Sequence, residues 1–193
     1  MNNYFSKKKG KIYIISGKLK RQKISLINTP NIKPTTNRIR ETLFNWLERH
    51  IKNARCLDCF SGSGALGIEA ISRHAAFVTS LEINKKTAYK LTKNVKKLNI
   101  SNMNVIHTDT FHWLKKRRKP YDIIFVDPPY KKQLIKKTLN LLEDRKWLKE
   151  DSLVYIEKEK KHSLVMPKNW ILYKKKNTRK IEFYLYIFKS KNI

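Results

Sequence analysis

LDCFSGSGALG, residues Leu57–Gly67, is the stretch that decides the fold of this chain. It carries three of the chain's five glycines, at positions 62, 64 and 67. An apolar strand leads into the glycines and a helix follows them, as in the loop that approaches a nucleotide-like ligand in α/β proteins. Glycines permit the tight turn, and helix N-terminal amides supply donors. The G-x-G-x-x-G pattern alone also fits NAD, so it leaves the ligand open.

Strands and helices alternate on both sides of this loop. Such alternation predicts right-handed βαβ units and a parallel sheet with helices on both faces. The predicted strands are Arg55–Asp58, Phe77–Glu82, Asn104–His107, Tyr121–Asp127 and Leu153–Glu157. The predicted helices are Ala65–Arg73, Lys85–Leu98, Thr110–Lys116 and Lys132–Leu142.

The pattern changes near the C-terminus. Trp170–Tyr173 and Ile181–Phe188 are two strands with only a basic turn between them, so we expect them to pair antiparallel. The sequence therefore predicts a Rossmann-like α/β fold with a seven-stranded, mostly parallel sheet and an antiparallel C-terminal hairpin. A six-stranded dinucleotide-binding fold does not end in this way.

The N-terminal sequence predicts a small β-hairpin. Lys11–Ser16 and Lys23–Ile27 form two short strands around the basic turn Gly17–Arg21. Pro30 and Pro34 then break the chain. A helix capped by Thr35 or Thr36 follows and runs to about His50, with its apolar side formed by Ile39, Leu43, Phe44, Trp46 and Leu47.

Acidic residues stand at the carboxyl ends of three successive predicted strands, where ligands bind in such sheets. Asp58 could reach the ammonium group of a methionine moiety. Glu82 is placed to accept hydrogen bonds from both ribose hydroxyls, and Asp109 could accept one from an adenine amino group. Each acid taken alone could equally be a solvated or helix-capping carboxylate. Three in succession favour a ligand.

Asp127–Tyr130, with the sequence DPPY, is the most specific chemical signal. An exocyclic amine on a base is a poor nucleophile, because its lone pair is delocalised into the ring. The Asp127 carboxylate and the Pro128 carbonyl could accept its two N–H bonds and localise that lone pair, while two prolines fix the backbone. Tyr130 could stack on the base. The motif favours methyl transfer from S-adenosylmethionine over hydride transfer.

The charge is strongly basic, with 44 Lys and Arg against 15 Asp and Glu, a net charge of +29. A polyanionic partner such as nucleic acid explains this balance. A genomic drift toward lysine explains part of it too, since 34 of the 44 basic residues are Lys and 10 are Arg. Charge therefore supports a nucleic-acid partner without deciding it.

Two further classes of protein are disfavoured. No apolar run approaches the length of a membrane span, and the stretch Ile123–Val126 is strand-sized. The polar Met1–Lys11 does not resemble a secretory signal, so we expect a cytoplasmic protein. Cys56 and Cys59 form a C-x-x-C, but residues three apart on a strand face opposite ways. We expect buried, inert thiols and no metal site.

With both motifs in place, the chain resembles the bacterial RsmD family, which methylates N2 of a guanine in small-subunit ribosomal RNA. The resemblance runs from about Lys11 to Phe188. It is carried by Ile14–Lys18, Pro34–Leu47, Leu57–Gly67, Val126–Tyr130 and Asn140–Asp144. The segment Pro34–Leu47, PTTNRIRETLFNWL, is much more specific than the glycine loop.

The resemblance implies a class I methyltransferase fold and assigns roles to residues. S-adenosylmethionine would be bound by Asp58, Phe60, Gly62, Gly64, Glu82 and Asp109. The guanine would be held by Asp127, Pro128 and Tyr130. RNA would be contacted by Lys18, Lys20, Arg21 and Lys23 of the hairpin and by Arg38 and Arg40 at the mouth of the active site.

The expected organisation is a basic tail over residues 1–10, an RNA-contacting hairpin over 11–34 and a methyltransferase domain over 35–193. The expected partner is 16S rRNA in the small ribosomal subunit or its assembly intermediate, and we expect a monomer. The residues alone give amine methylation on a base, and guanine N2 comes from the resemblance. The alternatives are an adenine-N6 DNA or RNA methyltransferase, a protein glutamine methyltransferase and an RNA-binding scaffold with reduced catalysis.

Overall fold

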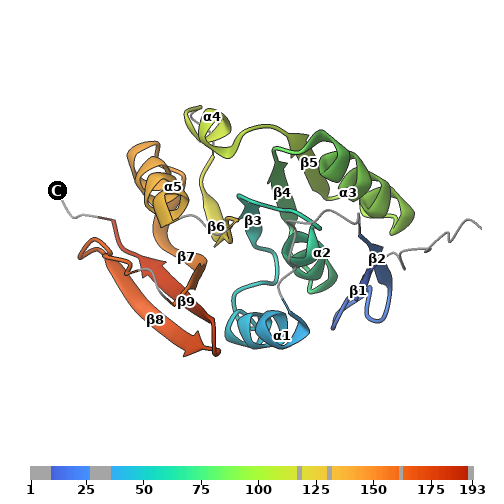
Figure 1. The fold of residues 1–193 in the computed structure, drawn as a ribbon, viewed down its shortest axis with the longest axis horizontal. Coiled ribbons are helices and arrows are strands. Elements are labelled where there is room, and N and C mark those ends of the chain that lie inside the picture. The colour runs from blue at the N-terminus through green and yellow to red at the C-terminus, as the bar shows by residue number, and fades with distance from the viewer. Residues whose placement is uncertain (1–9, 27–35, 117–118, 130–131, 161–162, 191–193) are drawn as a thin grey trace, which may run out of the picture.

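The computed structural model describes residues 10–26, 36–116, 119–129, 132–160 and 163–190 of the chain. Its centre is a seven-stranded sheet in the order β5-β4-β3-β6-β7-β9-β8, beside a two-stranded sheet of β1 and β2 (Figure 1). The strands are β1 Lys11–Tyr13, β2 Lys23–Ser25, β3 Arg55–Asp58, β4 Phe77–Glu82, β5 Met103–His107, β6 Tyr121–Val126, β7 Leu148–Glu159, β8 Trp170–Asn177 and β9 Ile181–Phe188. The helices are α1 Asn37–Trp46, α2 Ala65–Ser72, α3 Lys85–Lys97, α4 Thr110–Leu114 and α5 Lys132–Asp144.

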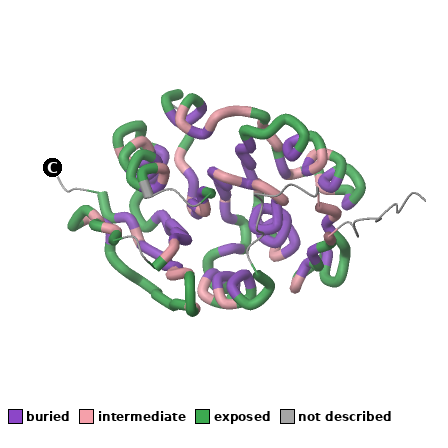
Figure 2. Tube along the Cα trace, viewed as in Figure 1, coloured by how far each residue is buried: buried purple, intermediate pink, exposed green. Residues whose placement is uncertain are grey.

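Two hydrophobic clusters cover the two faces of the large sheet. One contains buried side chains of α1, α2, α3 and the β1–β2 hairpin, and the other contains those of α4 and α5. Successive strand residues alternate between them: Ile123 and Phe125 belong to the first, Ile124 and Val126 to the second. Figure 2 shows buried positions along the strands and on the inward sides of the helices. The prediction of helices on both faces is confirmed.

The C-terminal strands pair antiparallel, as predicted, but in an order that their sequence did not specify. β9 lies between β7 and β8, pairing with both. Five of the eight β9 positions are buried, whereas all β8 positions after Trp170 are exposed. The apolar strand is therefore inserted into the sheet, and the lysine-rich strand forms its edge.

Several predicted boundaries shift for identifiable reasons. β1 ends at Tyr13 rather than Ser16, because the amides of Ile15 and Ser16 donate to Glu69 instead of to a strand. β7 begins at Leu148 rather than Leu153, since its first residue already pairs with Tyr121 of β6. The predictions for Pro30, Pro34, Thr35 and Ile27 lie outside the described residues.

Helix α1 begins where the sequence predicted but ends earlier. The Thr36 hydroxyl accepts a hydrogen bond from the Ile39 amide, so Thr36 is the N-cap. The helix ends at Trp46 and not at His50, with Leu47 as C-cap. Trp46 is only partly buried and packs against Phe183 of β9, with ring centroids 5.3 Å apart.

A buried carboxylate, Glu69, connects the β1–β2 hairpin and α1 to α2, the helix that carries it. It accepts hydrogen bonds from the amides of Ile15 and Ser16 at 2.9 and 3.0 Å. It also pairs with Arg73 at 3.0 Å and with the fully buried Arg40 of α1 at 3.9 Å. One side chain therefore fixes the hairpin, α1 and α2 relative to one another.

The turn of the hairpin packs directly on the end of α2. The Lys18 amide donates to the Ser72 carbonyl at 2.8 Å, and the Leu19 amide donates to the Ser72 hydroxyl at 3.0 Å. Gly17 has φ 82°, and a Cβ there would lie 1.9 Å from the Ser72 carbonyl oxygen. Only glycine satisfies both the left-handed backbone and this contact.

We expect Gly17→Ala to destabilise the protein, because the left-handed backbone alone costs about 1–2 kcal/mol with a side chain and the Cβ must also displace the Ser72 carbonyl. Urea unfolding followed by tryptophan fluorescence measures the loss. Gly10→Ala is the matched control, since its Cβ would meet only the flexible Leu26 side chain, at 3.2 Å. Equal free energies of unfolding for the two variants would contradict this account of the docked turn.

Candidate active site

The predicted ligand residues meet at the edge where the parallel strands end. β3 pairs with β4 on one side and β6 on the other, with Asp58 opposite Ser80 and Phe125. Glu82 is the last residue of β4, and Asp127 follows directly after β6. Asp58, Glu82 and Asp127 therefore lie at neighbouring strand ends, as predicted for a ligand site.

The glycine loop connects β3 to α2 with its backbone anchored to the neighbouring strands. The Cys59 amide donates to the Phe125 carbonyl at 3.0 Å, and the Ser61 amide donates to the Leu81 carbonyl at 2.9 Å. Gly64 has φ 77° and is the N-cap of α2. A Cβ on Gly64 would lie 2.2 Å from Leu91 of α3, so this glycine also lets the two helices approach closely.

Glu82 orients the loop. Its Oε2 accepts a hydrogen bond from the Gly62 amide at 2.9 Å, and its Oε1 accepts one from the Asn84 amide at 2.7 Å. A carboxylate has about four acceptor positions. Each oxygen therefore retains capacity for a further donor, while the backbone contacts hold the side chain at the loop.

Asp58 is the most unusual group of the site. It is 1% exposed, and neither carboxylate oxygen has a hydrogen-bond partner of normal geometry among the described residues. Burial, with a further contribution from the charge of Asp127, raises the pKa of Asp58 to about 7. The Phe60 amide and the Ser61 hydroxyl offset part of this rise. A buried carboxylate with so little hydrogen bonding is costly to the fold, and it is suited to a cationic ligand.

The other predicted cofactor residues border this cluster. Asp109 is half-buried and caps α4, where its Oδ1 accepts from the His112 amide at 2.7 Å. This is the capping role that the sequence left open as an alternative. Phe60 is half-buried in the loop, with an edge contact to Phe111 at 6.4 Å between centroids.

The structure describes the first three residues of the DPPY motif. Asp127 is half-buried, Pro128 is buried and Pro129 is exposed. Asp127 lies close enough to influence two buried groups, since its charge raises the pKa of Asp58 and contributes to a raised pKa of Tyr155. Tyr130 lies outside the described residues.

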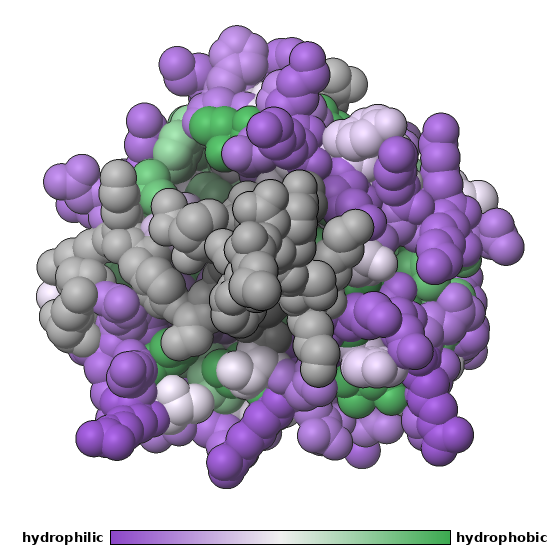
Figure 3. All heavy atoms as spheres, turned by 45° about the vertical axis from the view of Figure 1, so that its right-hand side comes forward, coloured by the Kyte–Doolittle hydropathy of each residue, from purple (hydrophilic) through white to green (hydrophobic). Residues whose placement is uncertain are grey.

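Five of the six residues that we expected to contact RNA are exposed, namely Lys18, Lys20, Arg21, Lys23 and Arg38. Figure 3, which brings the side of β1, β2 and α3 forward, shows hydrophilic side chains over most of the visible described surface.

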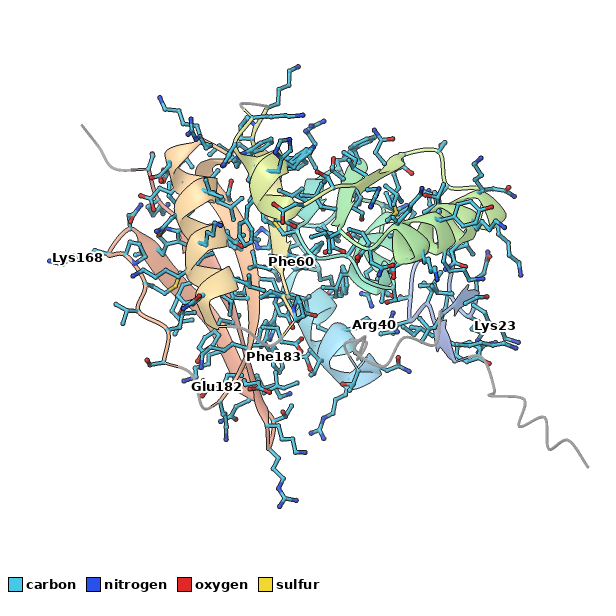
Figure 4. All side chains as sticks on the ribbon, turned by 45° about the horizontal axis from the view of Figure 1, so that its top comes forward. Lys23, Arg40, Phe60, Lys168, Glu182 and Phe183 are labelled. Atoms are coloured by element: carbon cyan, nitrogen blue, oxygen red, sulfur yellow. The ribbon has the colours of Figure 1, made fainter. Side chains whose placement is uncertain are left out.

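Arg40 requires a correction. It is 0% exposed, and one of its guanidinium nitrogens donates to the Tyr13 carbonyl and the Asn37 side chain at 2.7 and 2.8 Å. Figure 4 places it between α1 and the hairpin. A side chain without exposed surface cannot contact RNA in this structure, so the prediction for Arg40 is wrong: the residue ties α1 to the hairpin.

Two features of the structure were not predicted from the sequence. Glu69 carries the contacts that dock the hairpin, and the available signal was a lone acid within the apolar helix sequence ALGIEAIS. Three cations, Lys160, Lys176 and Arg179, line a cavity of about 390 Å³ together with Arg38. The available signal there was the basic turn between the last two strands.

The prediction that both cysteines are buried is confirmed. Cys56 and Cys59 are free, 0% exposed and located in different hydrophobic clusters. Burial raises the pKa of both thiols, which keeps them protonated and unreactive. Within the described ranges, three or more His, Cys, Asp or Glu side chains never gather closely enough to hold a metal ion. Nor is any described helix both long and apolar enough to span a membrane.

Comparison with known proteins identifies the family. A family model described as conserved hypothetical protein 95 matches residues 12–187. Ribosomal RNA small subunit methyltransferase D of Buchnera aphidicola subsp. Acyrthosiphon pisum is 66% identical over 188 residues, 97% of this chain and 98% of that protein. The Escherichia coli K12 protein of the same name is 42% identical over 178 residues, 92% of this chain and 90% of its own. The chain belongs to this family.

Solved structures agree with this assignment. A putative methyltransferase, yhhF, from Escherichia coli superposes with a TM-score of 0.89 at 40% identity, covering 94% of this chain and 100% of that one. The putative methylase HI0767 from Haemophilus influenzae gives 0.82 at 38% identity with the same coverage. The predicted family and the Rossmann-like methyltransferase fold are confirmed.

We expect Asp58→Asn to stabilise the ligand-free protein more at pH 8 than at pH 5. The pKa of Asp58 is about 7 in the folded protein, above its usual 3.8, so the folded state holds a proton that the unfolded state has released. Wild-type stability therefore falls as the pH rises from about 4 to above 7, and asparagine removes this loss. The difference between the two pH values is up to about 3 kcal/mol.

Urea unfolding of wild type and variant at both pH values measures this difference. Asp144→Asn serves as a control at an exposed acid, the last residue of α5. A stability gain that is the same at pH 5 and pH 8 would contradict the buried, unpaired state of Asp58.

Proposed function

We propose that this chain transfers a methyl group from S-adenosylmethionine to the exocyclic N2 amine of a guanine in 16S rRNA, within the small ribosomal subunit or its assembly intermediate. The observation that carries the proposal is the meeting of the buried Asp58 carboxylate with Asp127 and Pro128 at adjacent strand ends. The names of the relatives support ribosomal RNA of the small subunit as the substrate. The choice of guanine N2 rests on the family resemblance.

The residues present fit S-adenosylmethionine. The Asp58 carboxylate is buried, and among the described residues neither of its oxygens accepts a hydrogen bond of normal geometry, so it suits the ammonium group of the methionine moiety. Glu82 is held at the loop by the amides of Gly62 and Asn84, from where it would accept the ribose hydroxyls. Phe60 and Gly64 would border the cofactor, and the second carboxylate oxygen of Asp109, Oδ2, would accept from the adenine amino group.

When bound, this cofactor supplies a methyl group on a sulfonium leaving group, so the protein's task is to place and polarise the amine. The Asp127 carboxylate and the Pro128 carbonyl would each accept one N–H of the amine, which moves its lone pair out of the ring and toward the methyl carbon. Pro128 and Pro129 restrict the backbone so that both acceptors keep one orientation. Tyr130 would stack on the base, which has to leave its helix or loop to enter.

RNA binding would use the exposed cations of the hairpin, Lys18, Lys20, Arg21 and Lys23. The hairpin shares a hydrophobic cluster with α1 and α2 and is hydrogen-bonded to Glu69 and Ser72. Its charges are therefore presented at a fixed position relative to the strand ends. Such pre-organisation lowers the entropy lost on binding.

We expect Asp127→Ala to retain S-adenosylmethionine binding and to lose methyl transfer by roughly a hundredfold or more, the scale of one positioned catalytic group. Transfer of a labelled methyl group to small-subunit RNA gives the rate, and calorimetry gives cofactor affinity. Tyr130→Phe should lose less activity than Tyr130→Ala, because stacking needs the ring and not the hydroxyl.

Nucleoside analysis of the product separates the alternatives. N2-methylguanosine supports the proposal, and N6-methyladenosine would replace it with adenine methylation. RNA binding without any transfer of label would indicate a scaffold with reduced catalysis. Full turnover by Asp127→Ala would exclude the polarising role of this carboxylate.

A further inference from the structure

We propose that the basic cavity between α1 and the β8–β9 turn binds a backbone phosphate of the RNA substrate, beside the base that enters the active site. This inference rests on the proposed function for the identity of the RNA. It assigns a binding role to Lys160, Lys176 and Arg179, and it gives Arg38 a defined ligand.

The cavity is lined by four cations from three separate segments of the chain. Arg38 comes from the first turn of α1, Lys160 follows β7, and Lys176 and Arg179 lie at the β8–β9 turn. The Asn177 amide adds a neutral donor to the lining, which contains no Asp or Glu among the described residues. The Thr42 and Thr178 hydroxyls also border the cavity, but they donate to the Arg38 and Ile181 carbonyls. A hollow with several cations, a neutral donor and no acid is complementary to a phosphate group.

The four cations are available for a ligand. None of them forms an ion pair with an acid in the ranges that the structure describes. The nearest acid in sequence to the β9 side of the cavity is Glu182. It is already occupied, since it accepts from the Lys158 ammonium and the Tyr184 hydroxyl and lies 3.9 Å from Lys175. An incoming anion would therefore meet unneutralised charge.

Strand register places the cavity on the same edge of the sheet as the methyl-transfer residues. Val126 of β6 is opposite Ile156 of β7, which is opposite Tyr184 of β9, which is opposite Lys175 of β8. One residue further along, Glu157 of β7 is opposite Phe183, which is opposite Lys176, and Asp127 directly follows Val126 in the chain. Strands are about 4.8 Å apart, so the cavity begins about 10 Å from Asp127 along the edge. A nucleotide close to the target guanine could reach it.

The outward position of Arg38 follows from the contacts that bury Arg40. Residues two apart on a helix do not face the same way, so burial of Arg40 against Glu69 turns Arg38 outward. The other wall is fixed by Phe183, which packs on Trp46 of α1 at 5.3 Å between ring centroids. Figure 4 shows Glu182 and Phe183 where β9 passes α1. The cavity is therefore pre-formed by packed elements, unlike lysines spread over a solvated helix face.

The test replaces the four cavity cations together, as R38Q, K160Q, K176Q and R179Q, in the full-length chain. The matched control, K96Q, K97Q, K115Q and K116Q, removes the same charge from exposed positions at the ends of α3 and α4, away from the cavity. Binding of a small-subunit rRNA fragment is measured at several salt concentrations, with calorimetry of S-adenosylmethionine and methyl-transfer kinetics on both variants.

We expect the cavity variant to raise the KM for RNA about tenfold or more. The salt slope of its RNA binding should fall by about 0.7–0.9, which is the contribution of the one phosphate that the cavity neutralises. Its affinity for S-adenosylmethionine and its kcat should stay within about twofold of wild type. The control variant should leave the salt slope close to the wild-type value, because it removes no defined phosphate contact.

Equal changes in the two variants would overturn the proposal, because charge would then act diffusely over the surface. Loss of S-adenosylmethionine affinity in the cavity variant would overturn it as well, by placing these residues at the cofactor. If the wild type methylates no RNA, the proposed function fails, and the comparison of salt slopes still decides whether the cavity binds an RNA backbone.

Discussion

A single buried carboxylate, Glu69, organises the N-terminal half of the molecule. It receives two hairpin amides and the guanidinium groups of Arg40 and Arg73. Burial lowers the pKa of Arg40, and Glu69 counteracts that cost by stabilising the charged form. Removing one partner would leave an uncompensated charge in the interior, so the contacts depend on each other. This arrangement also affects the surface, because Arg38 lies two residues before the buried Arg40 on α1 and therefore faces outward.

Burial of an acid at the active-site edge of the sheet lowers the stability of the fold, and the rest of the molecule has to offset this loss. Asp58 is buried close to Asp127 and Glu82, and its pKa is raised to about 7 although the Phe60 amide and the Ser61 hydroxyl lower it in part. Packing alone would favour a neutral residue there. Such locally unfavourable groups are typical of sites that wait for a charged ligand. The two hydrophobic clusters on either face of the sheet supply the stability that allows it.

The cations that give the net charge of +29 do not all have the same role. Many lysines coat exposed helix faces, where each is solvated and interchangeable. Cations of the hairpin turn and of the cavity are different, because docked backbone and packed aromatic rings fix where they lie. Position relative to the strand ends, rather than the amount of charge, distinguishes a binding surface from a coat of lysine.

The sequence by itself determined the alternation of strands and helices, the glycine loop at 57–67 and the acids at the strand ends, because these follow from local periodicity and turn chemistry. It also indicated the correct opposite faces for Cys56 and Cys59. Only the tertiary structure decided that β9 enters the sheet inside β8, that Asp109 caps a helix and that Arg40 is buried. The strand order and the burial of Arg40 depend on partners distant in the chain, such as Glu69 for Arg40, and neither propensity nor spacing encodes which distant groups will meet.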